Sequence, residues 1–165
     1  MGVSRRKIEE YLEKWQGLLK LKDWDIAVKM VETEWRKSGD IKVDLEDRKA
    51  VLLINQNPVT CENVEELVVH ELLHLKLHGM DQMIEHLMSA VYGENEDDPK
   101  REFAYTQFMI LLESTVEDLT KGYLTATASK GALSFGRLKR EIDKELQSKQ
   151  LHKKTTVNAK GTIVQ

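Results

Sequence analysis

Apolar side chains recur at helical spacing close to the start of the chain. Between residues 4 and 20 they stand three or four positions apart, with charged residues between them. This spacing predicts an amphipathic helix that packs against a core. The apolar positions of the segment are Ile8, Tyr11, Leu12, Trp15, Leu18 and Leu19.

A period of two follows the first segment. Residues 25–33 alternate between apolar and polar, as expected of a strand with one buried face. Residues 41–45 and 50–55 have the pattern of two further strands, and residues 46–49 would join them as a hairpin. The unbroken apolar run VLLI in the second of these strands predicts that it is covered on both faces. The pattern therefore predicts a small antiparallel or mixed sheet of three strands.

Helical spacing returns beyond Pro58, where Thr60 and Asn63 are candidate caps. The next helix runs through an apolar stretch at residues 67–77, and glutamates fill its first turn, where the helix dipole favours them. Because glycine commonly follows the end of a helix, we expect this helix to stop at Gly79. His78 would then lie at its end, and residues 81–92 would form a separate, shorter helix.

A last helix is expected over residues 103–124, after an acidic loop at 94–98 that ends at Pro99. Its apolar residues recur at helical spacing, at positions 108, 111, 112, 116 and 119. The order of elements predicts a single α+β domain over residues 1–124. It would hold an N-terminal helix, a short three-stranded sheet and two later helices.

The motif His70-Glu71-Leu72-Leu73-His74 lies within the apolar helix and points to zinc chemistry. Its two imidazoles are four positions apart, so they lie one turn apart on one helix face and can reach a single Zn²⁺. Glu71 projects beside that ion, where its carboxylate can take a proton from a zinc-bound water. The alternative is a half-exposed helix whose histidines are merely polar, but the apolar flanks favour a buried cluster that needs a metal.

A catalytic zinc site takes three protein ligands and leaves one position open for water. His78 is near in sequence, but it would lie about 12 Å from His70 along the helix axis. Glu113 is the stronger candidate, because it is a carboxylate directly after an apolar stretch of the last helix. Glu117, one turn further on, is expected to hydrogen bond a ligand imidazole. The alternative is that both glutamates face solvent or pair with Lys121.

HELLH on one helix and ESTVEDL on a later one resemble the gluzincin zinc metallopeptidases, in which two histidines and a glutamate hold the metal. The size is similar to that of the minimal, single-domain members (minigluzincins) and of phage or prophage metallopeptidases. The phrases LKDWDI at 21–26 and DRKAVLLIN at 47–55 also resemble that group, and the resemblance spans residues 24–124. It departs at Lys76, where the extended zincin pattern usually has an apolar residue.

The resemblance implies a zincin-like fold and zinc-dependent hydrolysis of peptide bonds. Zn²⁺ would be held by His70, His74 and Glu113, with Glu71 as the general base. A peptide or protein substrate would add to an edge strand of the sheet, beside residues 50–55 or their hairpin partner. The alternative function is a non-proteolytic regulatory or interaction module that keeps the zincin fold and the metal.

Composition restricts the function classes further. A chain of 165 residues with 41% hydrophobic content can bury a real core, and its formal charge of −3 gives no argument for nucleic acid as a partner. We expect no membrane association, since no apolar run reaches spanning length and the first residues lack a signal-peptide pattern. Cys61 is the only cysteine, which fits a reducing compartment. These features predict a cytoplasmic protein.

Residues 125–165 differ from the rest of the chain. They hold nine basic and three acidic residues, a net charge of +6, against −9 for the first 124 residues. A short charged helix is expected over residues 133–150, followed by a polar end with a hint of strand alternation. The main prediction is a flexible, solvated basic tail. Electrostatic contact with nucleic acid and restraint of the enzyme by the strand-like end are the alternatives.

Overall fold

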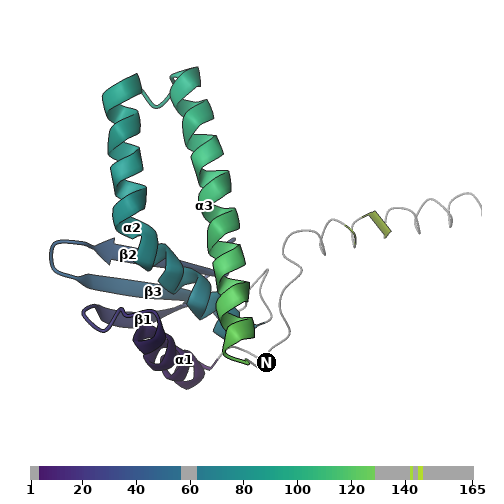
Figure 1. Cartoon of the computed structure of the whole chain (residues 1–165). Helices are drawn as coiled ribbons and strands as arrows, with labels where there is room; N and C mark the ends of the chain where they lie inside the picture. Colours follow the sequence, from purple (N-terminus) through teal and green to yellow (C-terminus); the bar gives the residue numbers. More distant parts are fainter. Residues whose placement is uncertain (1–3, 57–62, 129–141, 143–144, 147–165) are drawn as a thin grey trace, which may run out of the picture. The chain divides into compact units, whose positions relative to one another are not determined.

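The computed structural model describes residues 4–56 and 63–128, together with Ile142, Glu145 and Leu146. The chain divides into two compact units, Met1–Leu133 and Ser134–Gln165. The three described residues of the second unit are helical and fall within the helix expected at 133–150, and the rest of that unit lies outside the described residues. The first unit holds α1 (Arg5–Leu18), β1 (Asp25–Val31), β2 (Gly39–Asp44), β3 (Lys49–Asn55), α2 (Val64–Tyr92) and α3 (Pro99–Ala126) (Figure 1).

The sheet is mixed, and its strand order is β1-β3-β2. β1 pairs in parallel with β3, while β2 and β3 form an antiparallel hairpin in which Ile41 lies opposite Leu52. β3 is therefore the central strand, and β1 and β2 are the two edge strands. The predicted small α+β domain with a three-stranded sheet is confirmed at this level.

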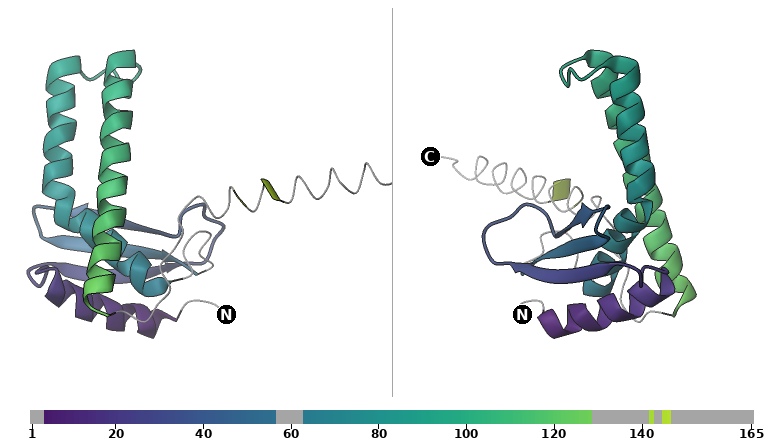
Figure 2. Two further views of the ribbon diagram at one scale, coloured as in Figure 1. Left: turned by 45° about the vertical axis from the view of Figure 1, so that its right-hand side comes forward. Right: turned by 90° about the vertical axis from the view of Figure 1, so that its left-hand side faces the viewer.

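α1 and α2 pack on one face of this sheet, and α3 packs against α2 (Figure 2). α1 contacts β1, α2 contacts β2, and the two helices also contact each other. On β3 the side chains of Ala50, Leu52 and Ile54 are at most 3% exposed, whereas Val51 and Leu53 on the other face are half-buried. The prediction that this strand is covered on both faces is wrong, because the unbroken apolar run reflects its central position and not a second layer of helices.

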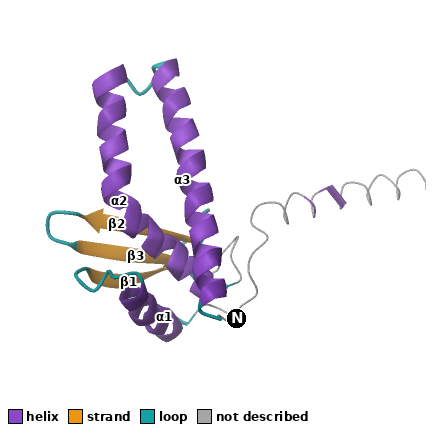
Figure 3. Ribbon diagram, in the orientation of Figure 1, coloured by secondary structure: helices purple, strands orange, loops and turns teal. Residues whose placement is uncertain are grey.

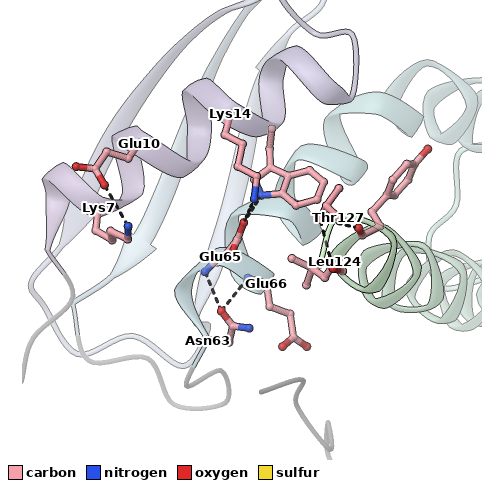
Figure 4. A network of polar contacts seen from close by, with 10 residues as sticks. Lys7, Glu10, Lys14, Asn63, Glu65, Glu66, Leu124 and Thr127 are labelled. Atoms are coloured by element: carbon pink, nitrogen blue, oxygen red, sulfur yellow. Dashed lines mark hydrogen bonds and ion pairs between the residues drawn. The ribbon is translucent and has the colours of Figure 1, made fainter. Parts of the chain in front are cut away.

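The start of α2 is fixed by a cap and by contacts with α1 (Figure 4). The Asn63 side chain accepts hydrogen bonds from the first free backbone N–H groups of the helix, which confirms this residue as a cap. Glu65, which is 6% exposed, accepts hydrogen bonds from Trp15 Nε1 at 2.8 Å and from Lys14 Nζ at 2.6 Å. A buried carboxylate thus joins the two helices that cover the sheet. Thr60, the other candidate cap, lies outside the described residues.

α2 does not end at Gly79, as the sequence pattern predicted, but continues as one helix of 29 residues (Figure 3). His78 therefore lies inside the helix and caps nothing. A glycine inside a helix costs about 1 kcal/mol relative to alanine, and the packing of α2 against α3 offsets this cost. The helix ends instead at Gly93, whose φ of 83° lies in the left-handed region. Asp98 then caps α3.

The buried core does not reach the far ends of α2 and α3. Leu75 of α2 and Leu112 of α3 belong to the core cluster, and none of the described residues between them does. Beyond these two positions the helices continue as a pair that extends away from the sheet (Figure 2). We call residues 76–111 the arm, and the described residues from 4 to 75 and from 112 to 128 the base.

Candidate metal centre

α2 places two imidazoles side by side at the point where the base meets the arm. His70 and His74 are one helical turn apart, with their Nε2 atoms separated by 3.2 Å. Their rings meet edge to face, and the ring centroids are 4.9 Å apart. The neighbouring Leu72 and Leu73 are at most 3% exposed. Because these leucines are packed in the core, the helix turn that carries both histidines is fixed.

α3 brings a carboxylate to the same place. Glu113 Oε2 lies 3.7 Å from His70 Nε2, and Glu113 Oε1 lies 3.5 Å from His74 Nε2. One ligand atom from each of the three residues can be chosen so that all lie within 4.8 Å of one another. The three residues singled out from the sequence as metal ligands are therefore brought together from two helices.

The spacing of these atoms fits a small divalent cation. Ligand atoms about 2.0–2.2 Å from a tetrahedral Zn²⁺ stand about 3.3–3.6 Å from one another. The two Nε2 atoms are 3.2 Å apart, each faces a different oxygen of Glu113 at 3.7 or 3.5 Å, and one atom from each residue can be chosen with all separations within 4.8 Å. Two imidazoles and one carboxylate suit Zn²⁺ well, although other divalent ions accept the same set. His78 is not part of the group. Within the part of the chain that the structure describes, His70, His74 and Glu113 form a group that could hold a metal ion.

Glu117 supports the first imidazole from its other nitrogen. Its Oε2 lies 3.4 Å from His70 Nδ1, and its Oε1 lies 2.8 Å from Lys121 Nζ. The predicted contact with an imidazole and the alternative pairing with Lys121 are thus both present. The hydrogen bond with His70 lowers the pKa of Glu117 to about 2, and Lys121 adds to this effect against the opposing effect of burial. An ionised carboxylate at this place orients the ring so that Nε2 faces Glu113.

Glu71 lies between α2 and the start of β2, and it is 6% exposed. A Cβ atom built on Gly39, the first residue of β2, would stand 2.8 Å from Glu71 Oε1. Burial raises the pKa of Glu71 to about 7, an effect that His70 opposes and that Asp40 and Glu113 reinforce. The carboxylate is therefore held in a narrow space beside the three candidate ligands.

The two imidazoles respond differently to this environment. Burial disfavours the charged form of His70, but its hydrogen bond with Glu117 and the charges of Glu71 and Glu113 outweigh burial and raise its pKa. The pKa of His74 is lowered by burial and by the neighbouring His70. Of the two imidazoles, His70 is therefore the one on which a proton is favoured, and a proton there competes with metal binding.

Sequence reasoning missed the role of Gly39. Its contact with Glu71 joins residues that are far apart along the chain, and helical or strand periodicity carries no information about such a contact. A signal was present, because Gly39 directly precedes an alternating strand without a tight turn that requires a glycine. Of the two strands expected beside a substrate, β3 is central, and its hairpin partner β2 has an unpaired edge in the described sheet.

Comparison with protein-family models, with curated proteins and with solved structures finds no match to this chain. The case for a function therefore depends on the residues and their geometry. Among the described residues, no helix combines the length and the apolar character needed to cross a membrane.

Proposed function

We propose that this protein is a zinc-dependent peptidase of the gluzincin type, and that residues 4–75 and 112–128 have a zincin-like fold. The observation that carries the proposal is the convergence of His70, His74 and Glu113 within 4.8 Å, beside the buried carboxylate of Glu71. A purely structural zinc site is closed by a fourth protein ligand. The described group offers three ligands and a neighbouring acid, which is the combination that hydrolysis requires.

Each residue has a separate task in this proposal. The two imidazoles and Glu113 would hold a divalent cation, which would supply a lowered pKa of bound water and polarisation of a carbonyl group. Glu71 accepts a proton from the attacking water and later gives it to the leaving amine. Glu117, held by Lys121, keeps the His70 ring in the orientation that presents Nε2 to the ion.

The proposed substrate is an extended peptide that adds to the free edge of β2. An edge strand offers unpaired backbone N–H and C=O groups, which bind a peptide without regard to most of its side chains. β2 begins at Gly39, and the Glu71 carboxylate lies so close to this residue that a Cβ built on it would stand 2.8 Å from Oε1. A peptide paired with this strand would therefore run past the proton-accepting group.

Metal analysis combined with a peptide-library assay tests this proposal. We expect about one zinc ion per chain, and cleavage that a chelator abolishes and added zinc restores. Glu71→Gln should keep the zinc and reduce turnover by about 100- to 10,000-fold, the range that general base catalysis contributes. Glu113→Ala should instead lower the zinc content. The two variants therefore distinguish loss of the general base from loss of a metal ligand.

Two results would contradict the proposal. Unchanged turnover in Glu71→Gln would show that Glu71 is not the general base. Unchanged zinc content in Glu113→Ala would show that Glu113 is not the third ligand. Stoichiometric zinc with no cleavage of any peptide in the library would favour the alternative, a regulatory or interaction module that keeps the metal site.

A further inference from the structure

The outer face of α2 in the arm carries an apolar stripe that no described element covers. Its first four members follow one another at intervals of three and four residues, the fifth lies four residues after the third, and the large ones are 52–63% exposed. Spacing of this kind is the a/d pattern of helices that pack in coiled coils. We call this set the outer stripe: Met80, Met83, Leu87, Ala90 and Val91.

α3 does not cover the outer stripe, because it packs against a different face of α2. Met88, which is 9% exposed, and the half-buried Ile84 lie on the packed face. The α2 part of the arm is therefore apolar on two sides, and within the described part of the chain it has a neighbour on only one of them. A surface helix normally has one apolar stripe and a polar opposite face, so a second contiguous stripe indicates an interaction site.

We propose that the outer stripe binds the outer stripe of a second copy of this chain, with the two α2 helices antiparallel around a two-fold axis. The stripe is self-complementary in that arrangement. When the axis passes between Met83 and Leu87, Met83 of each copy faces Leu87 of the other copy. In the same register Met80 faces Ala90. Large residues then meet at the centre and a large residue meets a small one at each end, as a two-fold interface requires.

The same register places opposite charges at both ends of the interface. Lys76 is the exposed residue one turn before the stripe, and Glu94 follows the C-cap of α2. In the antiparallel register Lys76 of one copy comes level with Glu94 of the other, and the two-fold axis repeats this pair at the opposite end. Charges at the flanks of a helical interface select the partner and its direction. This charge complementarity favours a second copy of the chain over another apolar partner.

Gly79 fits the same arrangement. It lies inside the helix, on the exposed side, and a Cβ built on it would have no heavy atom within 4 Å. Nothing within the described base and arm requires a glycine there, although it weakens the helix. In the antiparallel register Gly79 faces Val91, which is 63% exposed. A glycine at that position lets the valine of the second copy approach the helix backbone.

Sedimentation equilibrium of the full chain over a series of concentrations tests this proposal. We expect a monomer–dimer equilibrium, and we expect Leu87→Lys to raise the dissociation constant at least about tenfold. Leu111→Lys is the matched control, because Leu111 is 65% exposed on the α3 part of the arm and lies outside the stripe. This control should dimerise as the unchanged chain does. Zinc content should be the same in all three proteins, so the result does not depend on the proposed function.

A charge exchange tests the register. Lys76→Glu and Glu94→Lys should each weaken the dimer at low salt, and the two changes combined should restore it. A chain that is monomeric at all concentrations, a dimer that is insensitive to Leu87→Lys, or a double variant no tighter than the single ones would overturn the proposal. A monomer that binds lipid vesicles or another protein through the stripe would also overturn it.

Discussion

The base and the arm are built from the same two helices, yet they differ in what surrounds them. In the base, α2 packs against the sheet, α1 and α3, and Val68, Val69 and Leu72 are completely buried. In the arm each helix has a single described neighbour, and Met80, Met83 and Leu87 are about half exposed. The candidate ligands lie in the base, close to its border with the arm. The candidate site therefore lies on helix turns that are anchored in the core, and an exposed apolar surface is left where the helices extend beyond the core.

The largest difference between the base and the arm should appear in the free energy of unfolding that is lost when a leucine is replaced by alanine. Leu72→Ala removes a side chain with no exposed surface and should lower the free energy of unfolding by about 2–5 kcal/mol. Leu87→Ala, at 52% exposure, should change it by less than about 1 kcal/mol in dilute, monomeric protein. Urea unfolding of both variants measures this. Equal losses would show that the arm is as tightly packed as the base.

Stability should depend on pH through Glu71 in the base. Its pKa is raised from 4.5 to about 7 in the folded protein, so the native state binds more protons than the unfolded state between these values. Stability of the metal-free protein should therefore fall as pH rises through this range, by up to about 3 kcal/mol. Glu71→Gln should remove this fall, whereas Glu85→Gln in the arm should keep it. Urea unfolding of the metal-free proteins at about pH 5 and about pH 8 makes the comparison.

The third comparison concerns the support of the metal centre. Glu117→Gln removes the charge that faces His70 Nδ1 and should weaken zinc binding about 10- to 100-fold. Asp118→Asn changes an exposed neighbour on the same helix and should leave zinc affinity unaltered. Competition with a chelating dye measures both affinities. Equal affinity in Glu117→Gln and the unchanged chain would argue against a role for Glu117 in orienting the imidazole.

The smallest effects should come from two glycines. Gly39→Ala places a methyl group 2.8 Å from Glu71 Oε1 and 2.9 Å from Leu67 Cδ1, so we expect a loss of about 1–3 kcal/mol from overpacking. Gly79→Ala meets open space inside a helix and should stabilise the monomer by up to about 1 kcal/mol. Thermal unfolding at low protein concentration gives the sign of each change. A stable Gly39→Ala variant would show that the Glu71 carboxylate can move aside.

Local patterns predicted most of the elements. The alternation of β1, the hairpin of β2 and β3, the Asn63 cap and the spacing of His70 and His74 are all properties of a few neighbouring residues, and each is present in the structure. Glu113 could also be proposed as a ligand, because a carboxylate beside an apolar stretch is an unusual local feature. The zincin-like fold, by contrast, stays a prediction that no comparison tests.

Contacts between distant segments account for what the sequence did not predict. The pattern predicts the end of α2 at Gly79 because glycine often follows the last turn of a helix. The helix continues to Tyr92, where it packs against α3, a contact that a local pattern does not contain. The strand order could not be derived, since β1 pairs with β3 although β2 lies between them along the chain. The contact between Gly39 and Glu71 was missed for the same reason.

The division of the candidate ligands between two helices has a consequence for biosynthesis. A growing chain exposes both imidazoles well before Glu113 has left the ribosome, so the half-made protein offers an ion two donors in place of three. Tight ion capture must wait until α3 has been made and has docked. On the proposed function, a nascent chain would therefore not hydrolyse peptides while it is unfolded and surrounded by other polypeptides.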